Sequence, residues 1–364
     1  MPAWSKRGPR GPGTAPRLWR GQQRCLVPDH LCHHPRQSLG SLELLLADDA
    51  VGEVMVNGPD QVWVERDGAL VRVPLSLDAD AIERIVQRVV RPLGLRFDRS
   101  SPLVDARLPD GSRVHAVRPP VAVDGPYLTI RRFRHRALDL PAFTSDPTGA
   151  RLLEWMLAAG WNLLISGGTS SGKTTLLNTL ASGIPAGERV VTIEETAELR
   201  FERAHVVRLE ARPPNSEGAG AVTVGDLVRA ALRMRPDRIV VGEVRGAEAF
   251  DLIEALNTGH DGSLSTVHAN NPRSALLRLE ALALRASVDL PVRSVRAHID
   301  QCVDAIVHVE RGPFGERRLR LIAEVSGEAA GDGPLDVRTL WDVAAGRIAP
   351  PSRPTRRPCP SPPP

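Results

Sequence analysis

Apolar positions recur with regular periods only in the middle of the chain. We therefore expect the middle to fold and the two ends to be disordered. Residues 1–37 are rich in Pro, Gly and Arg and have no apolar period, so we expect them to be disordered. A similar composition returns from Pro351, and we expect residues 346–364 to form a disordered Pro-rich tail. The residues between these segments predict the folded part of the protein.

The first group of periodic segments predicts a small α/β domain over residues 38–136. A leucine cluster at 42–46 favours a short helix, and apolar residues from Ile82 to Val90 recur at helical spacing until Pro92 and Gly94 end the helix. Short runs rich in β-branched residues predict strands at 53–58, 61–66, 103–107, 113–117 and 127–132.

A linker over residues 137–146 leads to a second, larger domain over residues 147–345. Apolar runs predict strands at 163–165, 189–193, 239–241 and 265–267, and helices are expected at 174–180, around Leu227–Met234 and at 247–256. Strands that alternate with helices are typical of a parallel sheet covered by helices on both faces. The predicted fold class is therefore α/β.

Composition limits the kind of protein without naming it. The chain has 364 residues, 42% hydrophobic and 25% charged, which is typical of a soluble globular protein of about two domains. Its formal charge of +4 is too small to indicate nucleic-acid binding by itself. No apolar run reaches the length of about 18 residues that a membrane-spanning helix needs, and Met1–Arg20 lacks the apolar core of a secretory signal. We expect a cytoplasmic protein whose membrane contact, if any, is peripheral.

Cysteine is rare and scattered, which argues against a disulfide framework and favours a reducing compartment. Cysteine and histidine do gather near the start of the chain, but their spacing matches no standard zinc pattern. We favour an unstructured basic segment there over a zinc site. The residues concerned are Cys25, His30, Cys32, His33 and His34.

The strongest chemical signal is a glycine-rich loop that contains one of only two lysines, Lys6 and Lys173, in an arginine-rich chain. The loop matches G-x-x-x-x-G-K-[ST] and lies between an apolar strand and a helix, the context in which backbone N–H groups surround a phosphate. A compact ammonium fits between the β- and γ-phosphates better than a planar guanidinium does. We predict binding of ATP with Mg²⁺ by Gly167, Gly168, Thr169, Ser170, Ser171, Gly172, Lys173, Thr174 and Thr175.

Polar residues follow or flank the strands beyond this loop, where ligands of open parallel sheets collect. Glu243 is the predicted carboxylate that orients or activates the attacking water, although it could also serve only as a helix-start charge. Gly242 occupies the place of the aspartate in a generic Walker B strand. We therefore expect Mg²⁺ on Thr174, phosphate oxygens and waters, with Glu243 reaching the metal through water.

Two further pairs are candidates for the same edge of the sheet. Glu194 and Glu195 follow a buried strand, and His260 and His268 flank another; we expect the histidines to sense the γ-phosphate, with a satisfied structural histidine as the alternative. Arginines could close over that phosphate, although any one of them could be only a surface charge. The candidates are Arg107, Arg113, Arg131, Arg132, Arg212, Arg229 and Arg233.

The order of these motifs resembles the type II/IV secretion system ATPases, most of all the CpaF/TadA-like ATPases of tight-adherence (Flp) pilus assembly. The resemblance extends from about Leu42 to Leu340 and includes the phosphate loop. Beyond that loop, it rests on 55–60 (MVNGPD), 104–113 (VDARLPDGSR), 192–199 (TIEETAEL), 212–215 (RPPN), 235–238 (RPDR), 242–246 (GEVRG) and 258–269 (TGHDGSLSTVHA).

This resemblance implies a RecA-like motor domain behind the small N-terminal domain, hexameric rings, and an inner-membrane platform as the partner. By position it assigns phosphate and Mg²⁺ to Lys173 and Thr174, catalysis to Glu243, an acidic box to Glu194 and Glu195, and a His box to His260 and His268. Two features depart from the family: Glu195 stands where an aspartate is usual, and residues 1–37 are unlike its front end.

The leading hypothesis is an ATP-hydrolysing motor of a secretion or tight-adherence pilus system that drives pilin or protein export. A conjugation-type type IV secretion ATPase is the alternative within this class, and no aromatic-rich basic groove predicts direct nucleic-acid binding. A non-catalytic nucleotide-binding ring subunit remains open. A small-molecule kinase is disfavoured because the sequence indicates neither an acceptor pocket nor a lid.

Overall fold

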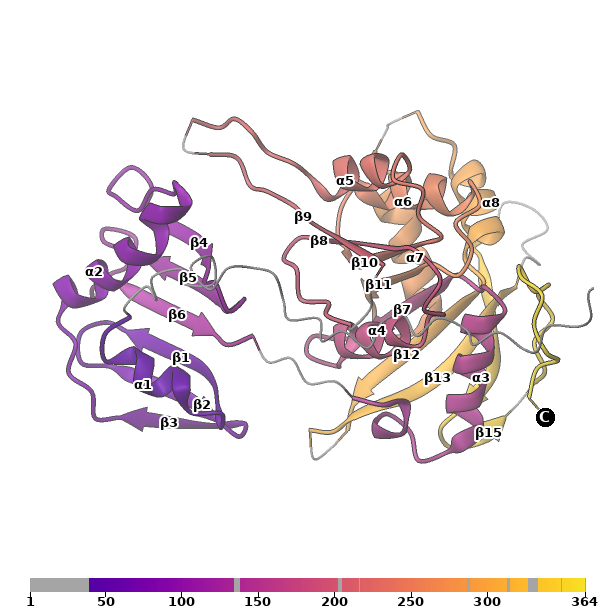
Figure 1. Ribbon diagram of the computed structural model, residues 1–364, viewed down its shortest axis with the longest axis horizontal. Coiled ribbons are helices and arrows are strands. Elements are labelled where there is room, and N and C mark those ends of the chain that lie inside the picture. Colours follow the sequence, from indigo (N-terminus) through magenta and orange to yellow (C-terminus); the bar gives the residue numbers. More distant parts are fainter. Residues whose placement is uncertain are drawn as a thin grey trace, which may run out of the picture. The chain divides into compact units, whose positions relative to one another are not determined.

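The computed structural model describes residues 39–133, 138–201, 205–215, 217–286, 289–312, 315–326, 333–347 and 349–363 (Figure 1). The expected disorder of residues 1–37 and the cysteine and histidine cluster around Cys25 lie outside the described residues. The boundaries expected at residues 134–137 also lie outside them.

Residues 51–131 build a six-stranded antiparallel sheet in the order β3-β2-β1-β6-β5-β4. Helix α2 buries Ile82, Ile85, Val86, Val89 and Val90 against it, as the helical spacing predicts. The elements are α1 (Leu42–Ala47), β1 (Val51–Asn57), β2 (Val62–Arg66), β3 (Ala69–Val73), α2 (Ala79–Val90), η2 (Arg91–Leu93), β4 (Leu103–Arg107), β5 (Arg113–Val117) and β6 (Tyr127–Arg131).

Residues 163–347 build a nine-stranded sheet in the order β15-β14-β13-β12-β7-β11-β10-β8-β9. Its strands are β7 (Leu163–Gly167), β8 (Val190–Glu194), β9 (Val206–Glu210), β10 (Arg238–Val244), β11 (Leu264–His268), β12 (Ala305–Arg311), β13 (Arg317–Ser326), β14 (Asp336–Asp342) and β15 (Gly346–Arg347). The accompanying helices are η3 (Leu140–Ala142), α3 (Pro147–Ala158), α4 (Lys173–Ser182), α5 (Val224–Ala231), α6 (Glu248–Leu256), α7 (Pro272–Ala283) and α8 (Val292–Cys302).

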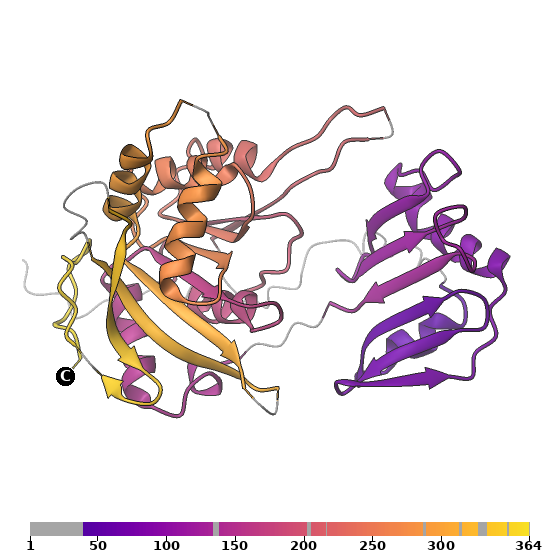
Figure 2. The ribbon, with the colours of Figure 1, turned by 180° about the vertical axis from the view of Figure 1, so that it is seen from behind.

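Helices cover both faces of this sheet, as the alternation of elements predicts. Helices α3 and α4 pack on one face with Leu163 and Ile165, whereas α5 to α8 pack on the other face with Leu164 (Figures 1 and 2). Neighbouring residues of a strand point to opposite faces, so a fully apolar strand such as β7 supplies both cores.

The sheet is only partly parallel, which corrects the expectation of a parallel sheet. Strands β9, β8, β10, β11, β7 and β12 run parallel, but β13, β14 and β15 add an antiparallel extension beside β12. The apolar residues of β13 and β14 that pack on the core give no signal of strand direction. The α/β fold class is correct, and the antiparallel part is a finding of the structure.

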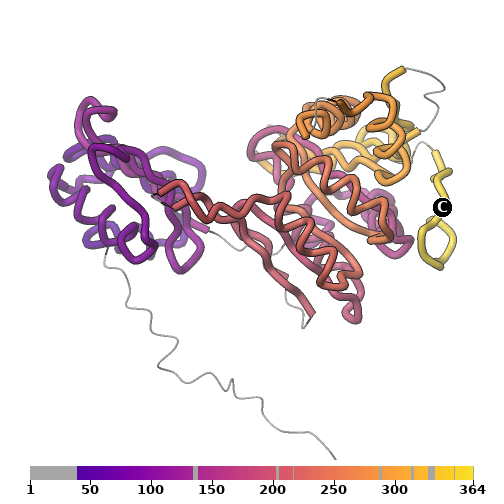
Figure 3. Tube along the Cα trace, turned by 90° about the horizontal axis from the view of Figure 1, so that it is seen from above, coloured from indigo at the N-terminus to yellow at the C-terminus, as the bar shows by residue number. Residues whose placement is uncertain are grey.

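The C-terminal segment also differs from the sequence expectation of a disordered tail. Residues 346–347 form β15, and residues 349–363 lie against the nine-stranded-sheet region with many hydrogen bonds and ion pairs. Figure 3 shows this segment in yellow, next to the label C that marks the end of the chain. Its contacts use guanidinium groups and prolyl carbonyls, which apolar periodicity does not detect.

Candidate nucleotide site

The phosphate loop connects β7 to α4 at the carboxyl edge of the parallel strands. Helix α4 begins with Gly172 as its N-cap, and no side chain caps it. The first backbone N–H groups of a helix lack partners within the helix and attract anions. The sequence prediction of a strand–loop–helix frame is confirmed.

Lys173 is held inside this loop rather than extended into water. Its ammonium donates to the carbonyl oxygens of Gly167 at 3.1 Å and Gly168 at 2.8 Å, and it lies 3.3 Å from Nδ1 of His268. Burial lowers the pKa of Lys173, and Glu243 opposes this effect. The ammonium is therefore poised among weak acceptors that a phosphate oxygen could replace.

Glu243 lies near the end of β10 and takes part in a charged chain. Its carboxylate accepts a hydrogen bond from Arg245 at 2.9 Å and lies 3.6 Å from His268, while Arg245 also donates to Glu195 at 2.7 Å. Burial would raise the pKa of Glu243, but Arg245, Lys173 and His268 together hold it below its usual range. The side chain is thus an anion at neutral pH and can accept a hydrogen bond from water.

The two histidines lie at opposite ends of β11, which corrects the expectation that both reach one edge. His268 ends the strand and its Nε2 lies 3.0 Å from Thr169 Oγ1 in the phosphate loop. His260 precedes the strand, and its Nδ1 lies 3.2 Å from the Pro236 carbonyl oxygen at the amino edge. The strand alone spans roughly 13 Å, so residues that bracket it cannot share an edge.

The acidic pair also divides between two environments. Glu195 is exposed and pairs with Arg245, whereas Glu194 is buried and accepts hydrogen bonds from the backbone N–H groups of Glu198 and Leu199. Burial raises the pKa of Glu194 to about 7. Glu194 therefore holds the turn after β8, and only Glu195 joins the charged chain of Glu243.

Gly242 provides the space for the Glu194 side chain. A Cβ atom at position 242 would lie 2.9 Å from Cγ of Glu194, closer than real Cβ atoms approach a neighbour. An aspartate in the usual Walker B place would collide with this buried carboxyl side chain. The departure noted in the sequence thus has a steric reason.

Two site residues were not predicted individually. Arg245 bridges Glu195 and Glu243. The sequence feature that could have indicated this is its position two residues after Glu243, because such residues lie on the same side of an extended segment. His308 in β12 is buried, and its Nδ1 lies 2.9 Å from Ser166 Oγ, directly before the loop. The sequence feature that could have indicated His308 is its position as a lone polar residue within an apolar run. Burial, with Arg320 and Lys173, lowers the pKa of His308.

The candidate arginines have separate roles in the structure. Arg107 pairs with Glu210 and donates to the Ala197 carbonyl oxygen, and Arg113 pairs with Glu198, so both contact residues that follow the acidic pair or belong to β9. Four others make local contacts: Arg132 with Asp48 and Asp49, Arg212 with Gly220, Arg229 with Asp226 and Asp251, and Arg233 with the Arg229 carbonyl oxygen. Arg131 is exposed on β6.

The residues present fit a triphosphate with a divalent cation. The uncapped start of α4, the buried Lys173 ammonium and the hydroxyl of Thr174 on the first turn supply N–H donors, a cation and an oxygen ligand at one place. Fold and site together define a P-loop nucleotide-binding protein with a RecA-like sheet.

Comparison with known proteins places this P-loop protein in a family. The family model described as "Type II/IV secretion system protein" matches residues 36–316. The chain is 42% identical over 318 residues to a protein of Mycobacterium tuberculosis named for conjugal transfer, covering 84% of this chain and 89% of that one. It is 35% identical over 309 residues to the conjugal transfer protein TrbB of Rhizobium radiobacter, covering 81% and 92%. The chain belongs to the type II/IV secretion system protein family.

Solved structures agree with the fold. The pilus retraction motor PilT with bound ADP superposes with a TM-score of 0.58 at 18% identity and covers 78% of this chain and 81% of its own. The Legionella pneumophila ATPase DotB gives a TM-score of 0.55 at 18% identity, covering 77% and 78%. In the part of the chain that the structure describes, no helix is long and apolar enough to cross a membrane.

Proposed function

We propose that this protein is an ATP-hydrolysing motor of a type II/IV secretion or pilus-assembly system. The observation that carries the proposal is the group formed by Lys173, Glu243 and His268 beside the uncapped start of α4. The charges match a reaction that needs phosphate positioning and an oriented water rather than a covalent intermediate.

Each residue has a distinct part in the proposed site. The backbone of Gly168–Thr174 and the Lys173 ammonium would bind the phosphates of ATP, and the Thr174 hydroxyl would hold Mg²⁺, which neutralises phosphate charge when bound. Glu243, ionised at neutral pH, would orient water. Arg245 positions Glu243, and His268 links Thr169 to Lys173 and Glu243.

The test is Mg²⁺-dependent ATP hydrolysis by the full chain and by Glu243→Gln. The substitution keeps the size of the side chain but removes its charge, so we expect the hydrolysis rate to fall by at least about 100-fold while ATP binding is retained. Glu254→Gln is the matched control, because Glu254 pairs with His298 on α8, away from the phosphate loop. A Glu243→Gln protein as active as the unaltered chain would rule out this assignment.

Two versions of the proposal differ in what the motor helps to transport. The sequence blocks resemble the CpaF/TadA-like branch, which supports pilin export in tight-adherence pilus assembly. The relatives of Mycobacterium tuberculosis and Rhizobium radiobacter carry conjugal-transfer names, which supports a conjugation-type role. On either version we propose a hexameric ring in the cytoplasm that acts on inner-membrane platform proteins, without direct binding of nucleic acid.

A further inference from the structure

The C-terminal segment, residues 349–363, is bound along the amino edge of the nine-stranded sheet, opposite the edge that carries the phosphate loop. Three arginines in this segment, Arg353, Arg356 and Arg357, reach carboxylates and backbone carbonyls there. Prolines fix much of the segment's backbone, and it forms no helix or strand. We call this segment the tail.

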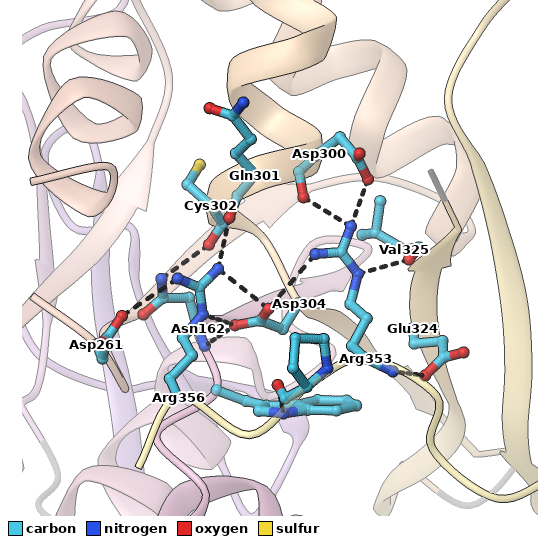
Figure 4. Close-up of polar contacts among 12 residues, drawn as sticks. Asn162, Asp261, Asp300, Gln301, Cys302, Asp304, Glu324, Val325, Arg353 and Arg356 are labelled. Atoms are coloured by element: carbon cyan, nitrogen blue, oxygen red, sulfur yellow. Dashed lines mark hydrogen bonds and ion pairs between the residues drawn. The ribbon is translucent and has the colours of Figure 1, made fainter. Parts of the chain in front are cut away.

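Arg356 contacts Asp304, which Figure 4 shows between the guanidinium groups of Arg353 and Arg356. Its guanidinium donates to both carboxylate oxygens of Asp304, at 2.6 and 3.1 Å, and to Asp261 at 3.2 Å. Asp304 is only 2% exposed; it also accepts the backbone N–H of Asn162 at 2.8 Å and lies 3.5 Å from the Arg353 guanidinium. A buried carboxylate left without its charge partner is strongly destabilising, so the tail supplies compensation that this site needs.

The two flanking arginines extend the contact in both directions. Arg353 pairs with Asp300 and donates to the Val325 carbonyl oxygen at 2.7 Å, as Figure 4 shows. Arg357 donates to Glu188 at 2.6 Å and to the Asp261 carbonyl oxygen at 2.7 Å. Each guanidinium thus bridges two acceptors, a use of its planar fork that lysine cannot reproduce.

Two tryptophans donate hydrogen bonds to backbone carbonyl oxygens of prolines that lie between and beyond these arginines. The indole N–H of Trp161 donates to the Pro354 carbonyl oxygen at 3.2 Å, and that of Trp155 donates to the Pro360 carbonyl oxygen at 2.7 Å. The two rings meet edge to face with centroids 5.4 Å apart. Aromatic side chains that receive extended proline-rich peptides are a recurrent mode of peptide recognition.

The receiving surface has the shape that the tail requires. Gly160 has a φ of +73°, and a Cβ atom there would lie 2.7 Å from Cγ of Arg357. The carbonyl of the preceding Ala159 accepts the backbone N–H groups of both Arg356 and Arg357 at 3.0 Å. Side-chain charge, backbone acceptors and a glycine gap therefore converge on one short stretch of the tail.

We infer that the amino edge of the sheet is a binding site for a proline-rich, arginine-bearing peptide, with residues 349–363 of this chain as its resident ligand. The site comprises Trp155, Trp161, Glu188, Asp261, Asp300 and Asp304. It is separate in space from the proposed nucleotide site, because it lies at the opposite ends of the strands.

The test uses a fluorescein-labelled peptide of residues 349–364 as the probe, under reducing conditions. In the full chain carrying Arg353→Ala, Arg356→Ala and Arg357→Ala, the site has lost its resident arginines and should bind the probe. In the unaltered chain the tethered tail competes at an effective concentration on the order of millimolar. We expect anisotropy titrations to show at least about tenfold tighter binding to the triple variant than to the unaltered chain.

Two controls separate this site from general charge attraction. A chain with Arg273→Ala, Arg278→Ala and Arg293→Ala loses the same charge from exposed positions on α7 and α8 and should bind the probe no better than the unaltered chain. A probe whose three arginines are alanine should not bind the triple variant. Equal binding of the probe to all three chains would overturn the inference.

Hydrogen exchange of the unaltered full chain tests the site even if the triple variant fails to fold. The backbone N–H groups of Ser352, Arg356 and Arg357 donate to protein acceptors and should exchange at least about tenfold more slowly than in the free peptide. Trp155→Phe with Trp161→Phe replaces each indole by a smaller phenyl ring without an N–H donor, and should speed this exchange. Exchange of the unaltered tail at the rate of the free peptide would overturn the inference.

Discussion

Glu194 illustrates how a residue can lie where the sequence places it while its side chain faces away from the predicted site. The sequence puts it directly after a buried strand, at the edge where ligands collect. The structure turns its carboxyl group into the protein, under the turn formed by residues 195–199, where backbone N–H groups satisfy it. The neighbouring Glu195 points the other way because successive side chains of an extended chain alternate.

The raised pKa of Glu194 gives a prediction for stability against pH. The pKa rises from an ordinary value of 4.5 to about 7 on burial, so the fold favours the protonated acid. That stabilisation is complete below about pH 4.5 and is lost as the pH rises through about 7. Glu194→Gln stays neutral, and its advantage in free energy of unfolding over the unaltered chain should grow by about 2 to 3 kcal/mol between pH 5 and 8.

Urea unfolding at several pH values would measure this difference. Glu195→Gln makes the same chemical change on an exposed side chain and serves as the matched control. If the difference between Glu194→Gln and the unaltered chain stayed constant across the range, Glu194 would not be ionising in the folded protein between these pH values.

At the scale of elements, periodicity predicted several elements that pack on the cores, but it left α3, α7, α8 and β12 unpredicted although they pack there too. Helix α2 and the buried strands β7, β8, β10 and β11 lie where the apolar pattern placed them. Strand β3 was missed because its residues are largely exposed and show no burial pattern. The phosphate loop was predictable because its spacing is local, whereas the Arg245 bridge and the position of His260 depend on strand ends that only the folded sheet brings together.

Helix α5 offers a prediction at this scale, because a reciprocal cap starts it. The Thr223 hydroxyl accepts the Asp226 N–H at 3.1 Å, and the Asp226 carboxylate accepts the Thr223 N–H at 2.9 Å. Thr223→Ala should lower the free energy of unfolding by about 1 kcal/mol in urea titrations. Ser41→Ala is the control, since Ser41 occupies the N-cap of α1 without a side-chain cap bond. Equal losses in both variants would argue against a stabilising cap at α5.

At the scale of the whole molecule, the proposed motor requires several copies of the chain to act together. Such a ring is part of the functional proposal, and it has a kinetic consequence. If neighbouring copies complete each nucleotide site, hydrolysis per chain depends on how many chains are assembled.

The corresponding measurement is Mg²⁺-dependent ATP hydrolysis per chain as a function of protein concentration, without an added acceptor. We expect specific activity to rise with concentration and then level off, because dilution separates the copies. Sedimentation at the same concentrations would show whether assembly and activity change together. Specific activity that is constant while the assembly dissociates would show that each chain works alone.

The bound tail also has a consequence for the order in which the protein forms during translation. The chain leaves the ribosome from its N-terminus, so all six parallel strands emerge before Arg353, Arg356 and Arg357 do. Until then Asp304 has no arginine partner from the tail, and its carboxylate must remain hydrated or protonated. The contacts at the amino edge of the sheet are therefore the last in this region to form, after the phosphate loop at the other edge has already been synthesised.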